Sequence, residues 1–139
     1  MTAATAYAKP LPHPTPLTQP FWDAAKAHRL ALQRCASCSQ YIYYPRAVCP
    51  HCGGGELEWK DVSGQGTVYS YTIARRPTAR PFAPDVPYVI AIVELAEGPH
   101  MTTNVVECSP DEVRVGMAVE VAFEDVTDEV TLVKFKPAS

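Results

Sequence analysis

Four of the five cysteines lie in two short motifs whose spacing suits a metal site. Cys35 and Cys38 stand in Cys-Ala-Ser-Cys, Cys49 and Cys52 stand in Cys-Pro-His-Cys, and ten residues separate the two pairs. Each Cys-x-x-Cys turn directs two thiolates at one ion, so two facing turns complete a four-sulfur shell with no open position. The pattern predicts one structural Zn²⁺ per chain and no catalytic role for it.

Other interpretations of these cysteines stay open but rank lower. Two disulfides, or two ordinary buried pairs, do not require such regular spacing. The second motif, Cys-Pro-His-Cys, also suits a rubredoxin-type iron site. In the first motif, however, Ser39 stands where a rubredoxin would carry glycine. We therefore rank zinc ahead of iron and keep a rubredoxin-like electron carrier as an alternative. The fifth cysteine, Cys108, shares no recognisable motif with a histidine or an acid and is interpreted as a small packing residue.

Composition limits the class of protein. The chain has 139 residues, 47% of them hydrophobic, and a formal net charge of -3. This length suits a small metal module joined to a second compact unit. This acidic balance argues against a protein that mainly binds phosphate backbones, which require a concentrated basic face, but net charge alone does not exclude a nucleic-acid partner. No apolar run approaches the roughly 20 residues that cross a bilayer, and metal-spaced cysteines suit a reducing compartment, so we expect a cytoplasmic protein without a membrane partner.

Residues 1–58 predict an arm, a helix and a ribbon. Residues 1–20 contain five prolines, which predict an extended arm. Residues 21–30 are rich in helix formers and predict a short amphipathic helix, whose Phe21 and Trp22 are exposed aromatic candidates for an interface, on the chain's own ribbon or on a partner. Residues 30–34 and 40–46 predict a hairpin around the first cysteine pair, which places the helix and zinc ribbon at 21–58.

The remainder, 59–139, predicts a barrel. Five segments show period-two alternation: 66–73, 88–95, 101–106, 118–124 and 130–135. Turn sequences separate them, and residues 109–116 predict a one-turn helix between the third and the fourth segment. Five short strands without a long helix predict a closed OB-fold barrel. The predicted fold class is mainly β: an N-terminal arm and short helix, a rubredoxin-like zinc ribbon, then a five-stranded OB-fold barrel. Single-stranded nucleic-acid binding is one use of such barrels, and it is an alternative function that ranks ahead of the rubredoxin-like electron carrier.

The order of several motifs resembles one known family. They are Phe21-Trp22 at a helix start, both cysteine pairs, Ser63-Gly64-Gln65-Gly66-Thr67 and Pro87-Tyr88-Val89. From Phe21 to Pro137 the chain is similar to the zinc-ribbon plus OB-fold family long catalogued as a domain of unknown function. The resemblance implies an accessory subunit that assembles with a thiolase-fold enzyme and helps to shape an acyl-CoA channel, in carbon-carbon bond cleavage, condensation or acyl transfer. With no hydratase domain fused in front, we expect the catalytic partner on a separate polypeptide.

Beside that resemblance, the residues show no catalytic constellation, because the carboxylates lie mainly in turns and on alternating strand positions that suit a solvated face. One loop, Arg75 to Pro87, holds three of the seven arginines and links the first two barrel strands, where OB-folds often bind ligands. Arg75, Arg76 and Arg80 are candidates for binding the phosphates of coenzyme A, and Phe82 for packing on its adenine. An alternative interpretation has equal weight: the same arginines keep the loop soluble or form ion pairs between subunits.

Overall fold

A computed structural model describes residues 8–139, so the first part of the predicted arm, residues 1–7, lies outside the described residues. Residues 8–18 run without a regular helix or strand toward α2, Gln19–Lys26. This helix begins two residues before the predicted start, because Pro20 occupies its first turn, where the missing N–H has no intrahelical partner to lose. Within the described residues, no helix combines the length and the apolar character that crossing a membrane requires.

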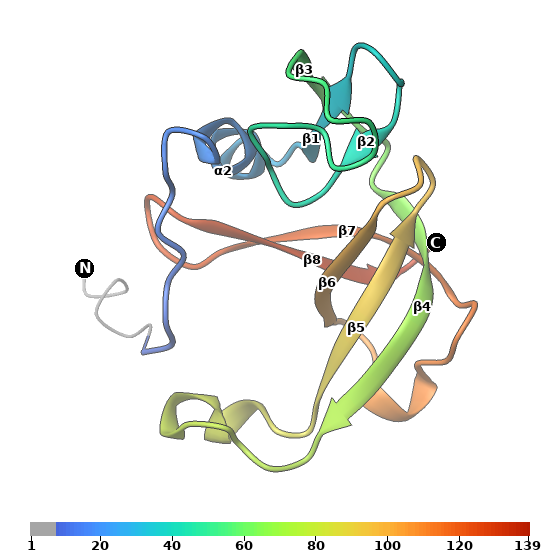
Figure 1. The fold of residues 1–139 in the computed structure, drawn as a ribbon. Coiled ribbons are helices and arrows are strands. Elements are labelled where there is room, and N and C mark those ends of the chain that lie inside the picture. Colours follow the sequence, from blue (N-terminus) through green and yellow to red (C-terminus); the bar gives the residue numbers. More distant parts are fainter. Residues whose placement is uncertain (1–7) are drawn as a thin grey trace.

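A three-stranded antiparallel sheet forms the ribbon (Figure 1). The predicted hairpin is present: β1, Ala31–Cys35, pairs with β2, Tyr41–Ile42. On its other side, β1 pairs with β3, Leu57–Asp61, a strand that the sequence analysis does not predict. The predicted boundary between residues 58 and 59 falls inside β3, whose last three residues pair with the start of β1.

Five strands close into a barrel in the order β4-β5-β6-β8-β7, with β4 pairing to β7. They are β4, Gln65–Ala74; β5, Tyr88–Leu95; β6, His100–Val105; β7, Ala118–Asp125; and β8, Thr131–Pro137. Each corresponds to a predicted segment. A short 3-10 helix, η2, Pro110–Glu112, lies between β6 and β7, and another, η1, Arg80–Asp85, lies in the long loop after β4. The mainly-β fold with an OB-type barrel is therefore confirmed.

One hydrophobic core joins the helix, the ribbon and the barrel. Phe21 of α2 and Leu32 of β1 pack with the inward side chains of the barrel, among them the fully buried Phe135. In β5, successive side chains point alternately into and out of the barrel: Val89, Ala91 and Val93 are buried, while the residues between them are more exposed. The metal end of the ribbon has only a small cluster of its own, formed by Cys35, Ile42 and Cys49.

A polar contact also ties the chain just after α2 to the barrel. His28 Nε2 lies 3.0 and 3.1 Å from the two carboxylate oxygens of Asp125, and the His28 ring stacks on Phe123 with 5.1 Å between centroids. The Thr131 hydroxyl donates a hydrogen bond to the same carboxylate. The bond from Thr131, followed by that from His28, lowers the pKa of Asp125 below its ordinary value of 3.8.

This contact predicts a pH dependence of stability. Because the pKa of Asp125 is lower in the folded chain, the ionised carboxylate stabilises the fold above pH 3.8, and that stabilisation is lost as the pH falls through the lowered pKa. Between neutral pH and about pH 3, we expect the free energy of unfolding to fall more steeply for the wild type than for Asp125→Asn. Urea unfolding at both pH values measures the difference, and equal acid sensitivity of the two proteins would contradict this account.

Candidate metal centre and neighbouring cleft

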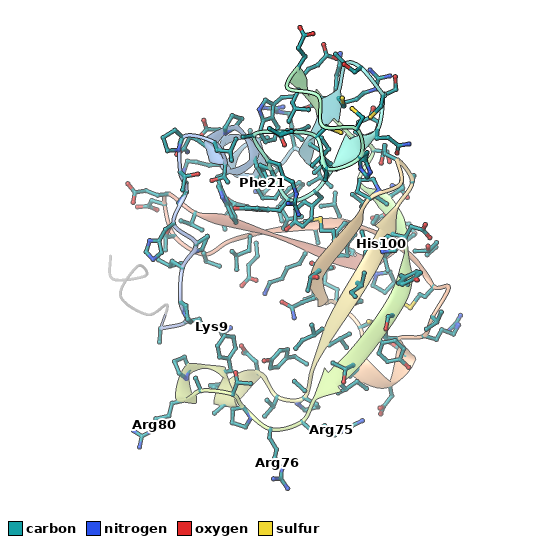
Figure 2. The ribbon with its side chains drawn as sticks, in the orientation of Figure 1. Lys9, Phe21, Arg75, Arg76, Arg80 and His100 are labelled. Atoms are coloured by element: carbon teal, nitrogen blue, oxygen red, sulfur yellow. The ribbon has the colours of Figure 1, made fainter. Side chains whose placement is uncertain are left out.

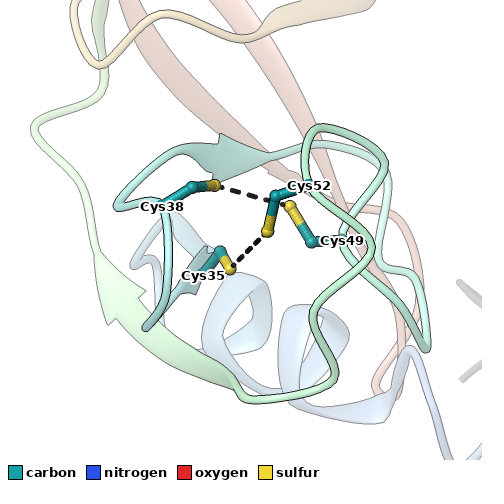
Figure 3. Close-up of side chains that lie close together, drawn as sticks. All are labelled: Cys35, Cys38, Cys49 and Cys52. Carbon is teal, nitrogen blue, oxygen red and sulfur yellow. Dashed lines mark hydrogen bonds between the residues drawn. The ribbon is translucent and has the colours of Figure 1, made fainter.

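The two cysteine motifs face each other at one end of the ribbon (Figure 3). Their four Sγ atoms lie within 4.8 Å of one another, with 3.6 Å between Cys35 and Cys52 and 3.7 Å between Cys38 and Cys49. Four thiolates in a tetrahedron around zinc, each about 2.3 Å from the ion, stand about 3.8 Å apart. The sulfur cage therefore fits a four-coordinate ion and leaves no coordination position for a substrate.

Backbone N–H groups support the cage. The backbone nitrogen of His51 lies 3.4 Å from the Cys49 sulfur, and the backbone nitrogen of Gly54 lies 3.4 Å from the Cys52 sulfur. The backbone N–H of Cys38 lowers the pKa of the Cys35 thiol to about 7, against the effect of burial. Although the Gly54 N–H lowers the pKa of Cys52, the neighbouring Cys35 and burial outweigh it and raise that pKa to about 12. Four thiolates so close together repel, so the fully ionised cage requires a cation.

The glycines after the second motif serve two purposes. Gly53 has a φ of +80°, the left-handed conformation that the exit from the turn needs. At Gly54, a Cβ atom would lie 3.4 Å from both the Cys52 sulfur and the Ser37 hydroxyl oxygen. Gly53 therefore supplies the positive backbone angle of the turn, while Gly54 keeps the space beside the cage free.

The four candidate residues for coenzyme A lie in the long loop, but Phe82 differs from the three arginines in its surroundings. Arg75, Arg76 and Arg80 are exposed and point away from the body of the fold, at the end of the barrel opposite the ribbon (Figure 2). Arg75 lies 3.9 Å from Asp111. Phe82 is half-buried instead, and its ring stacks on Tyr88 with 6.0 Å between centroids. The structure thus places Phe82 apart from the guanidinium groups.

Phe82 lines a cleft with a volume of about 600 Å³. One wall is the N-terminal arm at Lys9 and Pro10, a second is η1, and the ends of β5 to β8 form the rest. Several of its lining residues are not predicted from the sequence to border a cleft, among them Lys9, Tyr88 and Phe123. Strand alternation marks Tyr88 and Phe123 as strand residues but does not show that they border a cleft, and no sequence signal brings Lys9 next to η1.

The expectation that Phe21 is exposed is wrong. Its side chain is 2% exposed and packs against Trp22 and Tyr43, with ring centroids 5.0 and 5.9 Å away. Trp22 is half-buried, and its indole N–H donates to the Tyr44 hydroxyl at 3.2 Å. Phe21 therefore anchors the helix on the chain's own core, and Trp22 is the member of the pair that keeps accessible surface.

The fold and the sulfur cage define a class of protein: a rubredoxin-like zinc-ribbon module followed by an OB-fold barrel. Residues 22–58 match the family described as "ChsH2, rubredoxin-like zinc ribbon domain", and residues 59–124 match "ChsH2, C-terminal OB-fold domain". This chain belongs to that family, whose members include proteins named "DUF35 domain-containing scaffold protein". The predicted family is confirmed.

Three proteins similar to this chain carry descriptive names. A "DUF35 domain-containing scaffold protein" of Methanothermobacter thermautotrophicus is 38% identical over 103 residues, 73% of this chain and 77% of that protein. A "Probable enoyl-CoA hydratase alpha subunit" of Thermomonospora curvata is 42% identical over 119 residues, which are 85% of this chain but only 37% of that longer protein. A chain in the solved structure of the "Ltp2-ChsH2(DUF35) aldolase" superposes with a TM-score of 0.81 at 38% identity, covering 92% of this chain and 99% of that one.

Proposed function

We propose that this chain is a non-catalytic accessory subunit that assembles with a thiolase-fold enzyme and supports its acyl-CoA chemistry, whether carbon-carbon bond cleavage, condensation or acyl transfer. One observation carries the proposal: the chain matches 99% of a chain from a two-component aldolase, at a TM-score of 0.81. The scaffold name of the Methanothermobacter relative and the enoyl-CoA in the name of the Thermomonospora relative support it. The closed sulfur cage agrees, because it can hold a structure together but offers no open position for chemistry.

We further propose that the ion in the cage is one Zn²⁺ per chain, held by Cys35, Cys38, Cys49 and Cys52. The ion would supply folding free energy to the ribbon. The match of residues 22–58 to a zinc ribbon family and the spacing of the four sulfurs support this assignment.

Co-expression with a neighbouring thiolase-like gene, followed by gel filtration, tests the assembly. At micromolar concentration we expect one peak that contains both chains. Trp22→Ala should weaken the complex, because Trp22 is a half-buried aromatic residue of the kind that anchors interfaces. Tyr69→Ala, an exposed aromatic position on β4, is the matched control. Two separate peaks for the wild-type chains would contradict the proposal.

A narrower proposal concerns Arg75, Arg76 and Arg80, which would reach the phosphates of coenzyme A at the mouth of the partner's channel. Each charge-assisted contact would contribute roughly 1.5 to 3 kcal/mol if little water competes. Replacing all three by alanine should raise the KM of the assembled enzyme for its acyl-CoA by about tenfold or more, with zinc content and assembly intact.

Arg29→Ala is the control for this triple variant, because Arg29 is paired with Asp61 beside the ribbon, at 2.7 Å, and lies outside the loop. If the triple variant loses the complex, the arginines serve the subunit interface. If assembly and kinetics are both unchanged, the loop is a solvated connection and the narrower proposal is wrong.

A further inference from the structure

The cleft beside the barrel has the size of a small-molecule site. Its volume of about 600 Å³ lies within the roughly 300–1,000 Å³ of known ligand pockets, which are mostly apolar with a few polar groups. We propose that this cleft binds a neutral, largely apolar ligand and that the N-terminal arm is a strap closing it. The proposal does not depend on the proposed assembly, because the cleft belongs entirely to this chain.

The charges in the cleft favour a neutral ligand. Lys9 forms an ion pair with Asp85, and Lys134 Nζ lies 2.6 Å from a carboxylate oxygen of Glu124. Both lysines are thus already beside a carboxylate, and the exposed Glu107 adds a further negative charge. An anionic group entering the cleft would meet an excess of carboxylates, so its electrostatic energy would be unfavourable.

Aromatic and aliphatic side chains supply the attraction. Phe82 and Tyr88, whose ring planes are 27° apart, line one side, and Phe123 and Leu132 line the cleft from β7 and β8. An apolar group between them would remove apolar surface from water on both sides, which favours binding in proportion to the buried area. A flat group would also gain from stacking on the rings.

Lys9 connects the arm to η1 beside the cleft. Besides pairing with Asp85, the Lys9 ammonium lies 5.7 Å from the centre of the Phe82 ring, so the same side chain contacts both a charge and a ring of η1. The two partners of the ion pair are partly exposed, with side-chain accessibilities of 23% and 41%. Ion pairs of this kind contribute little free energy and weaken with salt, so the strap can open without the barrel unfolding.

Dye binding to the full chain, without any partner, tests the site. The neutral dye N-phenyl-naphthylamine should show a saturable rise in fluorescence with the wild type. Ala122→Phe, which fills the cleft from β7, should weaken binding about tenfold or more. Ala118→Phe, an exposed position near the other end of the same strand, should leave it unchanged. The sulfonated analogue anilinonaphthalene sulfonate should bind about tenfold more weakly than the neutral dye.

Absence of saturable binding, or equal binding by the wild type and Ala122→Phe, would overturn the site. Equal affinity for the two dyes would overturn the ligand class.

Hydrogen exchange tests the strap. Lys9→Glu and Asp85→Lys should each speed amide exchange in η1 and dye association, and the charge-swapped double variant should restore both. Lys60→Glu is the control, because Lys60 pairs with Glu58 at 3.7 Å on the ribbon. Single variants that behave like the wild type, or a double variant as open as the single ones, would overturn the strap.

Discussion

Replacing Cys49 with serine should release the metal and unfold the ribbon. Cys49 is 2% exposed and belongs to a cluster with only two other buried members, so this end of the molecule has little apolar core to hold it without an ion. A structural zinc contributes about 10 to 16 kcal/mol of apparent binding free energy that is coupled to folding. Loss of one thiolate removes most of that coupling.

Metal analysis and solubility measure this effect. We expect about one zinc per wild-type chain and none that survives dialysis in Cys49→Ser. Cys108→Ser is the control, because Cys108 packs against the barrel core, outside the cage, and burial, with a smaller effect of Glu112, raises its pKa and keeps it an unreactive thiol. A soluble Cys49→Ser protein with full zinc would contradict the assignment, and a coloured protein containing iron would favour the rubredoxin-like alternative.

Replacing Phe21 with alanine should cost about 3 to 5 kcal/mol of unfolding free energy. Phe21 is almost fully buried where α2 meets the core of the barrel and the tyrosines of the ribbon, so truncation leaves a cavity among these side chains. Denaturant unfolding of the isolated chain measures the loss.

Trp22→Ala is the matched comparison on the neighbouring residue. Because Trp22 is half-buried, its truncation should destabilise the isolated chain less than that of Phe21. A Phe21→Ala chain as stable as the wild type would contradict the place of Phe21 in the core.

Much of the fold follows from local patterns. The five barrel strands are predictable because each segment alternates in residue type along the sequence. In β5 and β6 this pattern corresponds to alternating buried and more exposed side chains. The sulfur cage is predictable because two Cys-x-x-Cys turns need only to face each other. The order of the motifs was enough to identify the family, which residues 22–124 confirm.

Features that depend on tertiary contacts could not be predicted. β3 is short, and its pairing with β1 depends on how the chain returns from the second cysteine pair. The burial of Phe21 depends on the barrel packing against α2, which helical periodicity alone does not show. The cleft requires Lys9 and Asp85, far apart in the sequence, to meet, and neither residue type nor spacing signals such a pair.

The central claim, that this chain is a subunit which a thiolase-fold enzyme needs, is tested most directly by titrating it into the isolated partner. The rate of acyl-CoA turnover should be near zero for either protein alone, should rise with added chain and should level off at a fixed ratio of the two. A partner that is fully active alone, or one whose rate does not respond to the added chain, would contradict the account.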